Sequence, residues 1–357
     1  MKGGVMKNLW FAVAAVTASL AFAGSGAAAT VTTVMSGLNN PRGLAFGPEG
    51  ALYVAEAGRG GPGPCTSSIR PQDPGLPTCY GPSGAVSRLW RGEQERVVTG
   101  LPSYANTMGQ AIGPHDIAML GRGNAHVSIG WGFDPRHRET LGPPWTSFDW
   151  IARVSASGGW WLETDIGAYE LAANPDGGVF DSNAYGLLAE PGQLAVADAG
   201  ANALLAVRAN GAISTLATLP SRAQGRPTDA VPTAVAVGPD GAYYLAQLTG
   251  LPFTLGVANV YRVVPGEAPT VAYSGFTTII DLTFGPDGSL YVLEHSTGPV
   301  FFALPGRLVK IAPDGTRTTV VSGLNRPGSV AFGPDGSLYV SVNSISVGTG
   351  AVLRIDP

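Results

Sequence analysis

The chain has 357 residues, 45% of them hydrophobic, and a formal charge of −4. This length supports one large or two ordinary domains with a full core. Only 13% of residues are charged, and 51 Gly with 29 Pro, without a strict period of three, exclude collagen and indicate many tight turns. Lys and Arg form no cluster, so we expect no nucleic-acid partner.

The N-terminus has the features of an export signal. Lys2 and Lys7 precede a run, residues 9–23, that is short and Ala-rich for a membrane span. Two A-x-A cleavage sites follow, the second ending at Ala29. We predict that residues 1–29 are a signal peptide, with an uncleaved anchor as the alternative. The mature protein is then secreted or periplasmic, with no membrane association beyond the signal.

One phrase recurs through the rest of the chain: a strand, a Gly-Pro-Asp-Gly turn and a second strand. The copies are PRGLAFGPEGALYVAEAG from Pro41, PHDIAMLGRGNAHVSIG from Pro114, AYGLLAEPGQLAVADAG from Ala184, PTAVAVGPDGAYYLAQ from Pro232, IIDLTFGPDGSLYVLEH from Ile279 and PGSVAFGPDGSLYVSVN from Pro327. Each copy continues with further short strands. Four antiparallel strands in about 40–50 residues are typical of a propeller blade, so we predict an all-β, six-bladed β-propeller.

The sixth copy is one strand short. TVTTVMSGLNNPRG, from Thr30, closely resembles RTTVVSGLNRPG, from Arg317, so the N-terminal strand is predicted to complete the last blade and close the ring. Closure removes exposed sheet edges, and we expect one monomeric domain over residues 30–357. The predicted blades span about 39–101, 112–170, 183–219, 231–274, 278–323, and 326–357 together with 30–37.

The repeated phrase resembles that of NHL-type propellers, and longer phrases narrow the resemblance. The ScyD/ScyE family has segments similar to AIGPHDIAMLG, YELAANPDGGVFDSNAYGLLAEPG, VADAGANALLAV, AVPTAVAVGPDGAYYLAQLTGLPF and GFTTIIDLTFGPDGSLYVLEHS. That family is named for genes clustered with biosynthesis of the pigment scytonemin. The resemblance implies an exported six-bladed propeller and brings no established reaction with it.

Two cysteines, Cys65 and Cys79, bracket a loop rich in Pro and Gly. In an exported protein such a pair most often forms a disulfide, which we predict here.

The topology assigns residues to two faces. The Gly-Pro-Asp-Gly turns lie on one face, so the long loops, the starts of the inner strands and the ends of the second strands share the other, which we call the loop-bearing face. The second position of each inner strand is occupied by Arg42, His115, Tyr185, Thr233, Ile280 and Gly328. The third position reads Gly43, Asp116, Gly186, Ala234, Asp281 and Ser329. The second strands end at Glu56, Ile129, Asp198, Gln247, Glu294 and Val342.

These positions supply the candidates for chemistry at the channel mouth. Five residues could perform acid–base catalysis there: His115, Asp116, Asp281, Glu294 and His295. Five carboxylates could hold Ca²⁺: Glu56, Asp116, Asp198, Asp281 and Glu294. The alternative is a hydrated polar mouth, in which each carboxylate accepts hydrogen bonds from backbone N–H groups at its own strand start.

Aromatic residues supply a second candidate site. Tryptophans gather between residues 131 and 161, and Trp131, Trp145 and Trp150, with Arg42 and Tyr185, are predicted to bind a ligand. The alternative is that the tryptophans fill space beneath a long loop or pack blade 2 against blade 3.

The segment NPDGGVFDSN, residues 174–183, carries Asp176 and Asp181 but lacks the spacing and terminal Glu of an EF-hand. It predicts either a turn held by Asx hydrogen bonds or an isolated Ca²⁺ site.

Three functional hypotheses follow. The first is an exported scaffold that binds a small molecule or protein on the loop-bearing face, because no complete catalytic motif is present. The second is a Ca²⁺-dependent, lactonase-like hydrolase with its site at the channel mouth. The third is a quinone-dependent sugar dehydrogenase, for which this chain is short of Lys.

Overall fold

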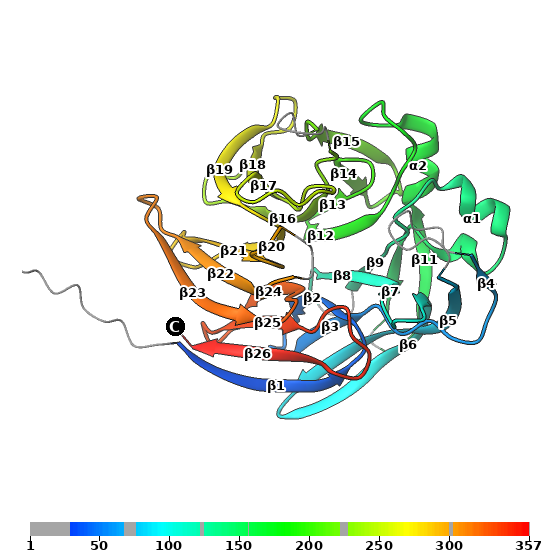
Figure 1. Ribbon diagram of the computed structural model, residues 1–357, viewed down its shortest axis with the longest axis horizontal. Coiled ribbons are helices and arrows are strands. Elements are labelled where there is room, and N and C mark those ends of the chain that lie inside the picture. The colour runs from blue at the N-terminus through cyan, green and yellow to red at the C-terminus, as the bar shows by residue number, and fades with distance from the viewer. Residues whose placement is uncertain are drawn as a thin grey trace, which may run out of the picture.

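The computed structural model describes residues 29–67, 76–121, 125–155, 157–221, 228–299 and 303–356, and within them the predicted all-β fold is confirmed. Six antiparallel sheets stand in a ring, which makes the chain a six-bladed β-propeller (Figure 1). The predicted signal peptide lies almost wholly outside the described residues. In the described ranges no helix is long and apolar enough to cross a membrane.

Each sheet is one blade, and its strands run in order from the channel outwards. Blade 1 has β2 (Pro41–Phe46), β3 (Leu52–Glu56), β5 (Thr78–Trp90) and β6 (Glu93–Asn106), with the short strands β4 (Cys65–Thr66) and β7 (Ala111–Ile112). Blade 2 has β8 (Pro114–Met119), β9 (Ala125–Ile129), β10 (Trp150–Val154) and β11 (Trp160–Asp165). Blade 3 has β12 (Ala184–Glu190), β13 (Gln193–Asp198), β14 (Ala203–Arg208) and β15 (Ile213–Thr218).

The other three blades follow the same plan. Blade 4 has β16 (Pro232–Val237), β17 (Tyr243–Gln247), β18 (Ala258–Val263) and β19 (Thr270–Phe276). Blade 5 has β20 (Ile279–Phe284), β21 (Leu290–Glu294), β22 (Gly306–Ile311) and β23 (Arg317–Leu324). Blade 6 has β24 (Ser329–Phe332), β25 (Leu338–Val342), β26 (Gly350–Asp356) and, from the N-terminal end, β1 (Thr30–Leu38).

The N-terminal strand closes the ring as predicted. β1 pairs antiparallel with β26, from Thr30 opposite Asp356 to Leu38 opposite Gly350. The innermost strands contact one another in order around the ring, and β24 returns to contact β2. The sequence did not predict the two extra strands of blade 1, which arise because β5 and β6 continue beyond the blade and pair with β4 and β7.

The Gly-Pro-Asp-Gly turns explain why the phrase repeats. In blade 5, Gly285 N–H donates to the Ser289 carbonyl (2.8 Å), Asp287 Oδ1 accepts from Ser289 N–H (3.0 Å), and Gly288 has a φ of 76°. Pro sets the turn, Asp satisfies a backbone donor, and Gly alone adopts the left-handed position without strain. The same Asp also pairs with Lys310 on β22 (2.8 Å).

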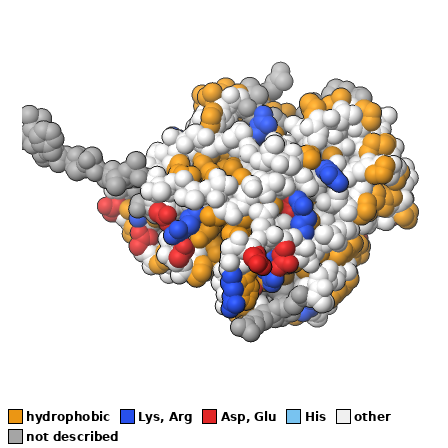
Figure 2. Space-filling model, turned by 90° about the horizontal axis from the view of Figure 1, so that it is seen from below, with side chains coloured by type: hydrophobic (Ala, Val, Ile, Leu, Met, Phe, Trp, Pro, Cys, Tyr) orange, Lys and Arg blue, Asp and Glu red, His pale blue; other side chains and the backbone are white. Residues whose placement is uncertain are grey.

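Surface charges elsewhere are paired in a similar way. Equivalent turn carboxylates meet an Arg of the third strand: Asp240 with Arg262 (2.6 Å) and Asp335 with Arg354 (3.2 Å). Figure 2 shows blue and red side chains lying side by side on one edge of the molecule, while hydrophobic side chains gather along its right-hand margin. Exposed pairs of this kind contribute little stability each.

Helices interrupt the repeat between β9 and β12. The chain adds α1 (Arg136–Leu141), the 3₁₀ turn η1 (Trp145–Ser147) and α2 (Ile166–Ala173). The repeat pattern did not predict α2, although its ends carry recognisable signals. Asp165 caps the N-terminus by accepting from Ala168 N–H (2.9 Å), and Asn174 ends the helix in a left-handed conformation.

Candidate functional site

The start of five inner strands carries a β-bulge at the position that the sequence singled out. In β8, Pro114 lies opposite Ile129 and Asp116 opposite Ser128, so His115 has no partner across the ladder. The same shift occurs at Tyr185, Thr233 and Ile280 in β12, β16 and β20, and in β2 it spans Arg42 and Gly43. A bulge re-aims the side chain of its extra residue and is common beside active sites. These five side chains are therefore set apart from the sheets at the channel mouth.

Three of these bulged residues come from adjacent blades and form a polar cluster. The rings of His115 and Tyr185 lie 4.5 Å apart. Arg42 donates to the Ala111 carbonyl (3.1 Å) and also contacts the Tyr185 side chain. Burial raises the pKa of the Tyr185 hydroxyl, while the nearby Arg42 lowers it. Tyr185 thus keeps its proton at neutral pH and acts as a hydrogen-bond donor.

Glycine makes room for the imidazole in this cluster. A Cβ on Gly130 would lie 2.1 Å from Cε1 of His115. Any side chain at this position would therefore displace His115, which is only 1% exposed.

His295 joins the cluster from blade 5. Its Nδ1 lies 2.8 Å from the Pro327 carbonyl, so Nδ1 carries the proton and Nε2 bears the lone pair. The pKa of His295 is lowered to about 4, chiefly by burial and also by the charges of Arg42 and Arg326, against the Pro327 hydrogen bond. The imidazole is therefore neutral at physiological pH, with the lone pair on Nε2.

Asp116 joins blade 2 to blade 3. Its Oδ1 accepts from Ile117 N–H (2.8 Å) on its own strand, and its Oδ2 accepts from Leu187 N–H (2.7 Å) of the next blade. Burial and then the charge of Asp281 raise the pKa of Asp116 well above its usual range. A Cβ on Gly43 would lie 1.9 Å from Asp116 Oδ1, which explains the small residue in the neighbouring inner strand.

Asp281 joins blade 5 to blade 6 in the same manner. It accepts from Leu282 N–H (2.7 Å) and from Val330 N–H (2.8 Å) of the next blade. Burial raises the pKa of Asp281 to about 6, although hydrogen bonds from Ser329, Val330 and Leu282 oppose the rise. The two aspartates thus lie at the mouth, and backbone donors of two blades satisfy each.

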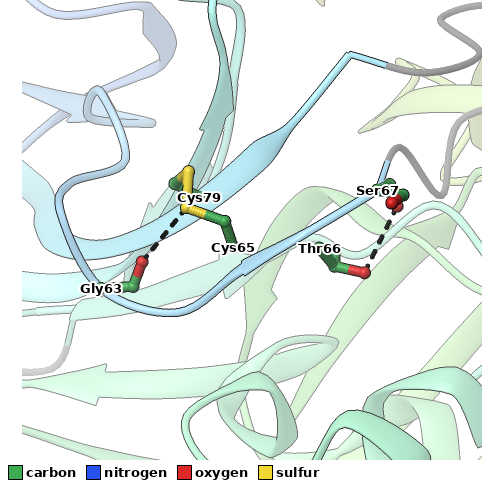
Figure 3. Close-up of a disulfide and its surroundings, with 5 residues drawn as sticks. All are labelled: Gly63, Cys65, Thr66, Ser67 and Cys79. Atoms are coloured by element: carbon green, nitrogen blue, oxygen red, sulfur yellow. Dashed lines mark hydrogen bonds between the residues drawn. A yellow bond between two sulfur atoms is a disulfide. The ribbon is translucent and has the colours of Figure 1, made fainter.

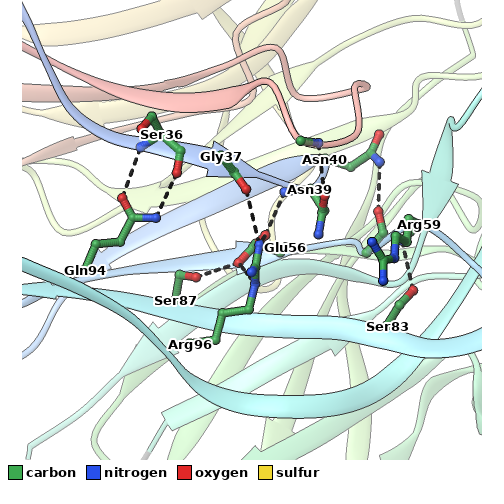
Figure 4. Close-up of polar contacts among 12 residues, drawn as sticks. Ser36, Gly37, Asn39, Asn40, Glu56, Arg59, Ser83, Ser87, Gln94 and Arg96 are labelled. Carbon is green, nitrogen blue, oxygen red and sulfur yellow. Dashed lines mark hydrogen bonds and ion pairs between the residues drawn. The ribbon is translucent and has the colours of Figure 1, made fainter.

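The acids at the ends of the second strands hold loops in place. Glu56 accepts from Asn39 N–H (2.6 Å) and Ser87, and receives two hydrogen bonds from Arg96 (2.8 and 2.9 Å; Figure 4). Glu294 accepts from Thr277 N–H (2.8 Å) and pairs with Arg307. These arrangements match, because each carboxylate fastens the loop that leads into its own inner strand.

Asp198 fastens the loop before β12 in the same way. It accepts from Asn183 N–H (2.7 Å), Gly200 N–H, Ala201 N–H (both 3.1 Å) and the Ser182 hydroxyl (2.7 Å). Across the described part of the chain, no three His, Cys, Asp or Glu residues are arranged to hold a metal ion. Two of the five predicted calcium ligands, Asp116 and Asp281, accept from inner-strand N–H groups of two blades, and the other three accept from loop N–H groups. The channel mouth therefore does not fit the Ca²⁺ centre of the second hypothesis.

Apolar side chains pack against Tyr185 and form its cover. Leu248 and Phe253, from the loop after β17, belong to one buried cluster with Ile280 and Val342, and Tyr185 packs against it. Phe253 is 9% exposed. Sequence patterns did not indicate this cover, because Leu248 and Phe253 lie in an irregular loop without repeat partners.

Burial contradicts the predicted ligand-binding role of Trp131 and Trp145. Both are almost fully buried, with Tyr104 and Phe148 packed between them at centroid distances of 5.0–6.3 Å. Trp150 is half-buried and donates from Nε1 to the Thr146 carbonyl (3.0 Å). Burying these large rings fills the space beneath the long loop of blade 2, which was the alternative.

The predicted disulfide between Cys65 and Cys79 is confirmed (Figure 3). It joins β4 to β5, where the two cysteines lie opposite each other in the ladder. The intervening residues 68–75 lie outside the described residues.

Hydroxyl groups that the sequence did not single out connect the blades at the mouth. Ser128 donates to the Tyr185 carbonyl (2.6 Å), Thr233 to the Ile279 carbonyl (3.0 Å) and Ser341 to the Arg42 carbonyl (2.8 Å). Thr233 occupies a bulged position, so the aligned columns contained a signal for it.

Comparison with known proteins supports the fold. No family model matches the chain, and no curated protein matches it. Three solved structures are similar: a glucose dehydrogenase (TM-score 0.55, 15% identity, 92% of this chain and 99% of that one), a gluconolactonase from Xanthomonas campestris (0.52, 12%, 92% and 89%) and a streptogramin B lyase (0.52, 12%, 92% and 98%).

These likenesses show a shared fold. Structural neighbours of this kind are six-bladed propellers, and those named above are enzymes. The resemblance to the ScyD/ScyE family, export and partner choice stay predictions.

Proposed function

We propose that the protein is a hydrolase that opens a lactone or another cyclic ester at the mouth of the loop-bearing face. The observation that carries this proposal is the bulged cluster of Arg42, His115 and Tyr185, with His295 beside Arg42. Support also comes from the fold, which a gluconolactonase shares. Acid, base and oxyanion-stabilising groups are thereby gathered from four blades.

The cluster supplies one role for each group. The Arg42 charge and the Tyr185 hydroxyl stabilise the negative charge that develops on the substrate carbonyl oxygen. Nε2 of His295 takes a proton from water, and the water oxygen attacks the carbonyl carbon. The ring C–O bond then breaks, the proton passes to the departing alkoxide, and a hydroxy acid is released. The His115 ring packs against the Tyr185 ring at a tilt of 42° and positions it.

Entry to this site requires the cover to move. Leu248 and Phe253 lie over the mouth, so the loop between β17 and β18 acts as its gate. Phe253→Ala removes the larger of the two apolar side chains and leaves every polar residue of the cluster in the sequence. We expect this variant to raise kcat/KM several-fold.

The experiment is a panel of γ-lactones, δ-lactones and macrocyclic esters incubated with the purified protein. Hydroxy-acid release is followed by a pH indicator and verified by mass spectrometry. Hydrolysis above the buffer rate supports the proposal. A ligand that binds and is recovered intact supports the scaffold hypothesis instead.

The pH profile provides a second test. The low pKa of His295, about 4, keeps its base form populated well below pH 6. We expect kcat/KM to stay flat from about pH 8 to about pH 5, whereas an ordinary histidine base with a pKa of about 6.5 loses activity across that range. A midpoint near 6.5 would show that another group is the base.

A further inference from the structure

Three oxygen atoms beneath the loop between α2 and β12 are buried without a donor. They are Glu170 Oε2, Asn174 Oδ1 and Asp181 Oδ1, and no hydrogen-bond partner reaches them among the described residues. Glu170 is only 1% exposed. Buried polar atoms are nearly always satisfied, so three unsatisfied acceptors in one short segment indicate a missing positive partner.

Local structure brings these three residues together. Asn174 ends α2 one turn after Glu170, and its N–H donates to the Glu170 carbonyl (2.8 Å). Glu170 Oε1 accepts from Asp181 N–H (3.3 Å), which directs its carboxylate towards the loop. The Asn174 amide donates to the Gly178 carbonyl (3.0 Å), which fixes the amide plane. These contacts link the end of α2 to the loop before β12, and Figure 1 shows α2 beside blade 3.

Electrostatics also disfavours two bare carboxylates here. The pKa of Glu170 is raised to about 7, first by burial and then by the charges of Asp198, Asp176 and Asp181, against one backbone hydrogen bond. Burial likewise raises the pKa of Asp181 to about 7, with Asp198, Asp229, Asp134 and Asp176 adding to it. Further acids thus surround this pair, so a proton or a cation must compensate.

We propose that Glu170, Asn174 and Asp181 bind one Ca²⁺ ion that ties α2 to the loop before β12. The donors are two carboxylates and an amide oxygen, which suit a hard cation, and backbone carbonyls and water complete the usual six to eight ligands. Asp181 also borders a groove of about 890 Å³ with Asp176 and Asp229, which provides an entry path. This site is separate from the mouth and does not depend on the hydrolase proposal.

The other residues of the segment have structural roles. Asp176 Oδ1 accepts from Gly178 N–H (2.7 Å) and its Oδ2 from Asn202 Nδ2 (2.8 Å), as in an Asx turn. Asn183 Oδ1 accepts from Trp131 N–H (3.1 Å). The sequence allowed either an Asx turn or a Ca²⁺ site in residues 174–183. Asp176 forms the turn, and the proposed cation site uses Asp181 with Glu170 and Asn174.

The test is calorimetric titration of the chelator-treated protein with CaCl₂. We expect one ion per chain and a higher melting temperature with Ca²⁺. Asp181→Asn should weaken binding at least tenfold, and Glu170→Gln with Asp181→Asn at least a hundredfold. The amides keep the side-chain shapes, and the amide oxygen that Glu170→Gln introduces can still accept the same backbone N–H, so circular dichroism should be unchanged.

Asp287→Asn is the matched control, because Asp287 is an exposed acid in a turn on the opposite face. It should bind Ca²⁺ like the unaltered protein. The proposal is overturned if no heat is seen up to about 10 mM Ca²⁺, beyond the weakest extracellular modules. It is also overturned if the double variant binds as tightly as the control. Lactone hydrolysis is measured separately, so each proposal can fail alone.

Discussion

Asp281→Asn tests whether the acids at the mouth are buried connectors between blades. Asp281 accepts one N–H through each oxygen, from Leu282 and Val330. An amide offers one acceptor, so the variant leaves one N–H facing an NH₂ group. The loss of one hydrogen bond with an unsatisfied donor costs about 1–3 kcal/mol. We therefore expect the variant to be less stable than the unaltered protein at pH 4, where both side chains are neutral.

As the pH rises, the stability difference shifts in favour of the variant. Since folding raises the pKa of Asp281 from 3.8 to about 6, its stabilising contribution is complete below about pH 4 and is lost as the pH rises through 6. The rise corresponds to about 3 kcal/mol, an upper value because Asp281 keeps part of its surface exposed. The amide has no such dependence. At pH 8 the variant should be as stable as the unaltered protein or more stable.

Urea denaturation at pH values from 4 to 8, followed by circular dichroism, measures this crossover. Asp287→Asn is the control, and its curve should run parallel to that of the unaltered protein, because the pKa of Asp287 is lowered to about 2 by Lys310 and the group is ionised throughout. If the difference between Asp281→Asn and the unaltered protein changes by less than about 1 kcal/mol over this range, the reasoning about Asp281 is refuted.

Three further substitutions probe the packing that positions the site. Gly43→Ala places a Cβ 1.9 Å from Oδ1 of Asp116 and should cost about 3 kcal/mol in thermal denaturation; an unchanged melting temperature would contradict the close approach of β2 and β8. Glu56→Ala removes the acceptor of the Asn39 N–H and the ion pair with Arg96, so denaturant titration should show a free energy of unfolding lower by about 3 kcal/mol. A decrease below about 1 kcal/mol would mean that the loop keeps its place without Glu56. Trp131→Ala should cost about 3–5 kcal/mol, against less than about 1 for Trp161→Ala, whose side chain is 48% exposed; equal effects would argue against the buried cluster.

The repeated phrase was sufficient to predict the architecture. Copies of one strand–turn–strand unit indicated six blades, and the likeness of residues 30–37 to the end of blade 5 predicted the pairing of β1 with β26. The aligned columns also placed Arg42, His115 and Tyr185 at the same mouth. These predictions succeed because turn residues and strand period are local properties of the chain.

The chemistry at those positions was harder to predict, because it depends on partners far away in sequence. The donor to Asp116 Oδ2 is Leu187 in the next blade, and that to Glu56 includes Arg96 on β6. No local pattern shows that a carboxylate is already satisfied. Burial of Trp131 likewise follows from how the blade 2 loop folds over it.

Hydrolysis by the mouth cluster is tested most directly by Tyr185→Phe. This change removes only the hydroxyl and keeps the ring that packs against His115. With the best lactone of the panel, we expect kcat/KM to fall about 100-fold, as when one oxyanion donor is removed, while the melting temperature is nearly unchanged. An unchanged kcat/KM, or no lactone hydrolysed by the unaltered protein, would contradict the assignment of hydrolysis to this cluster.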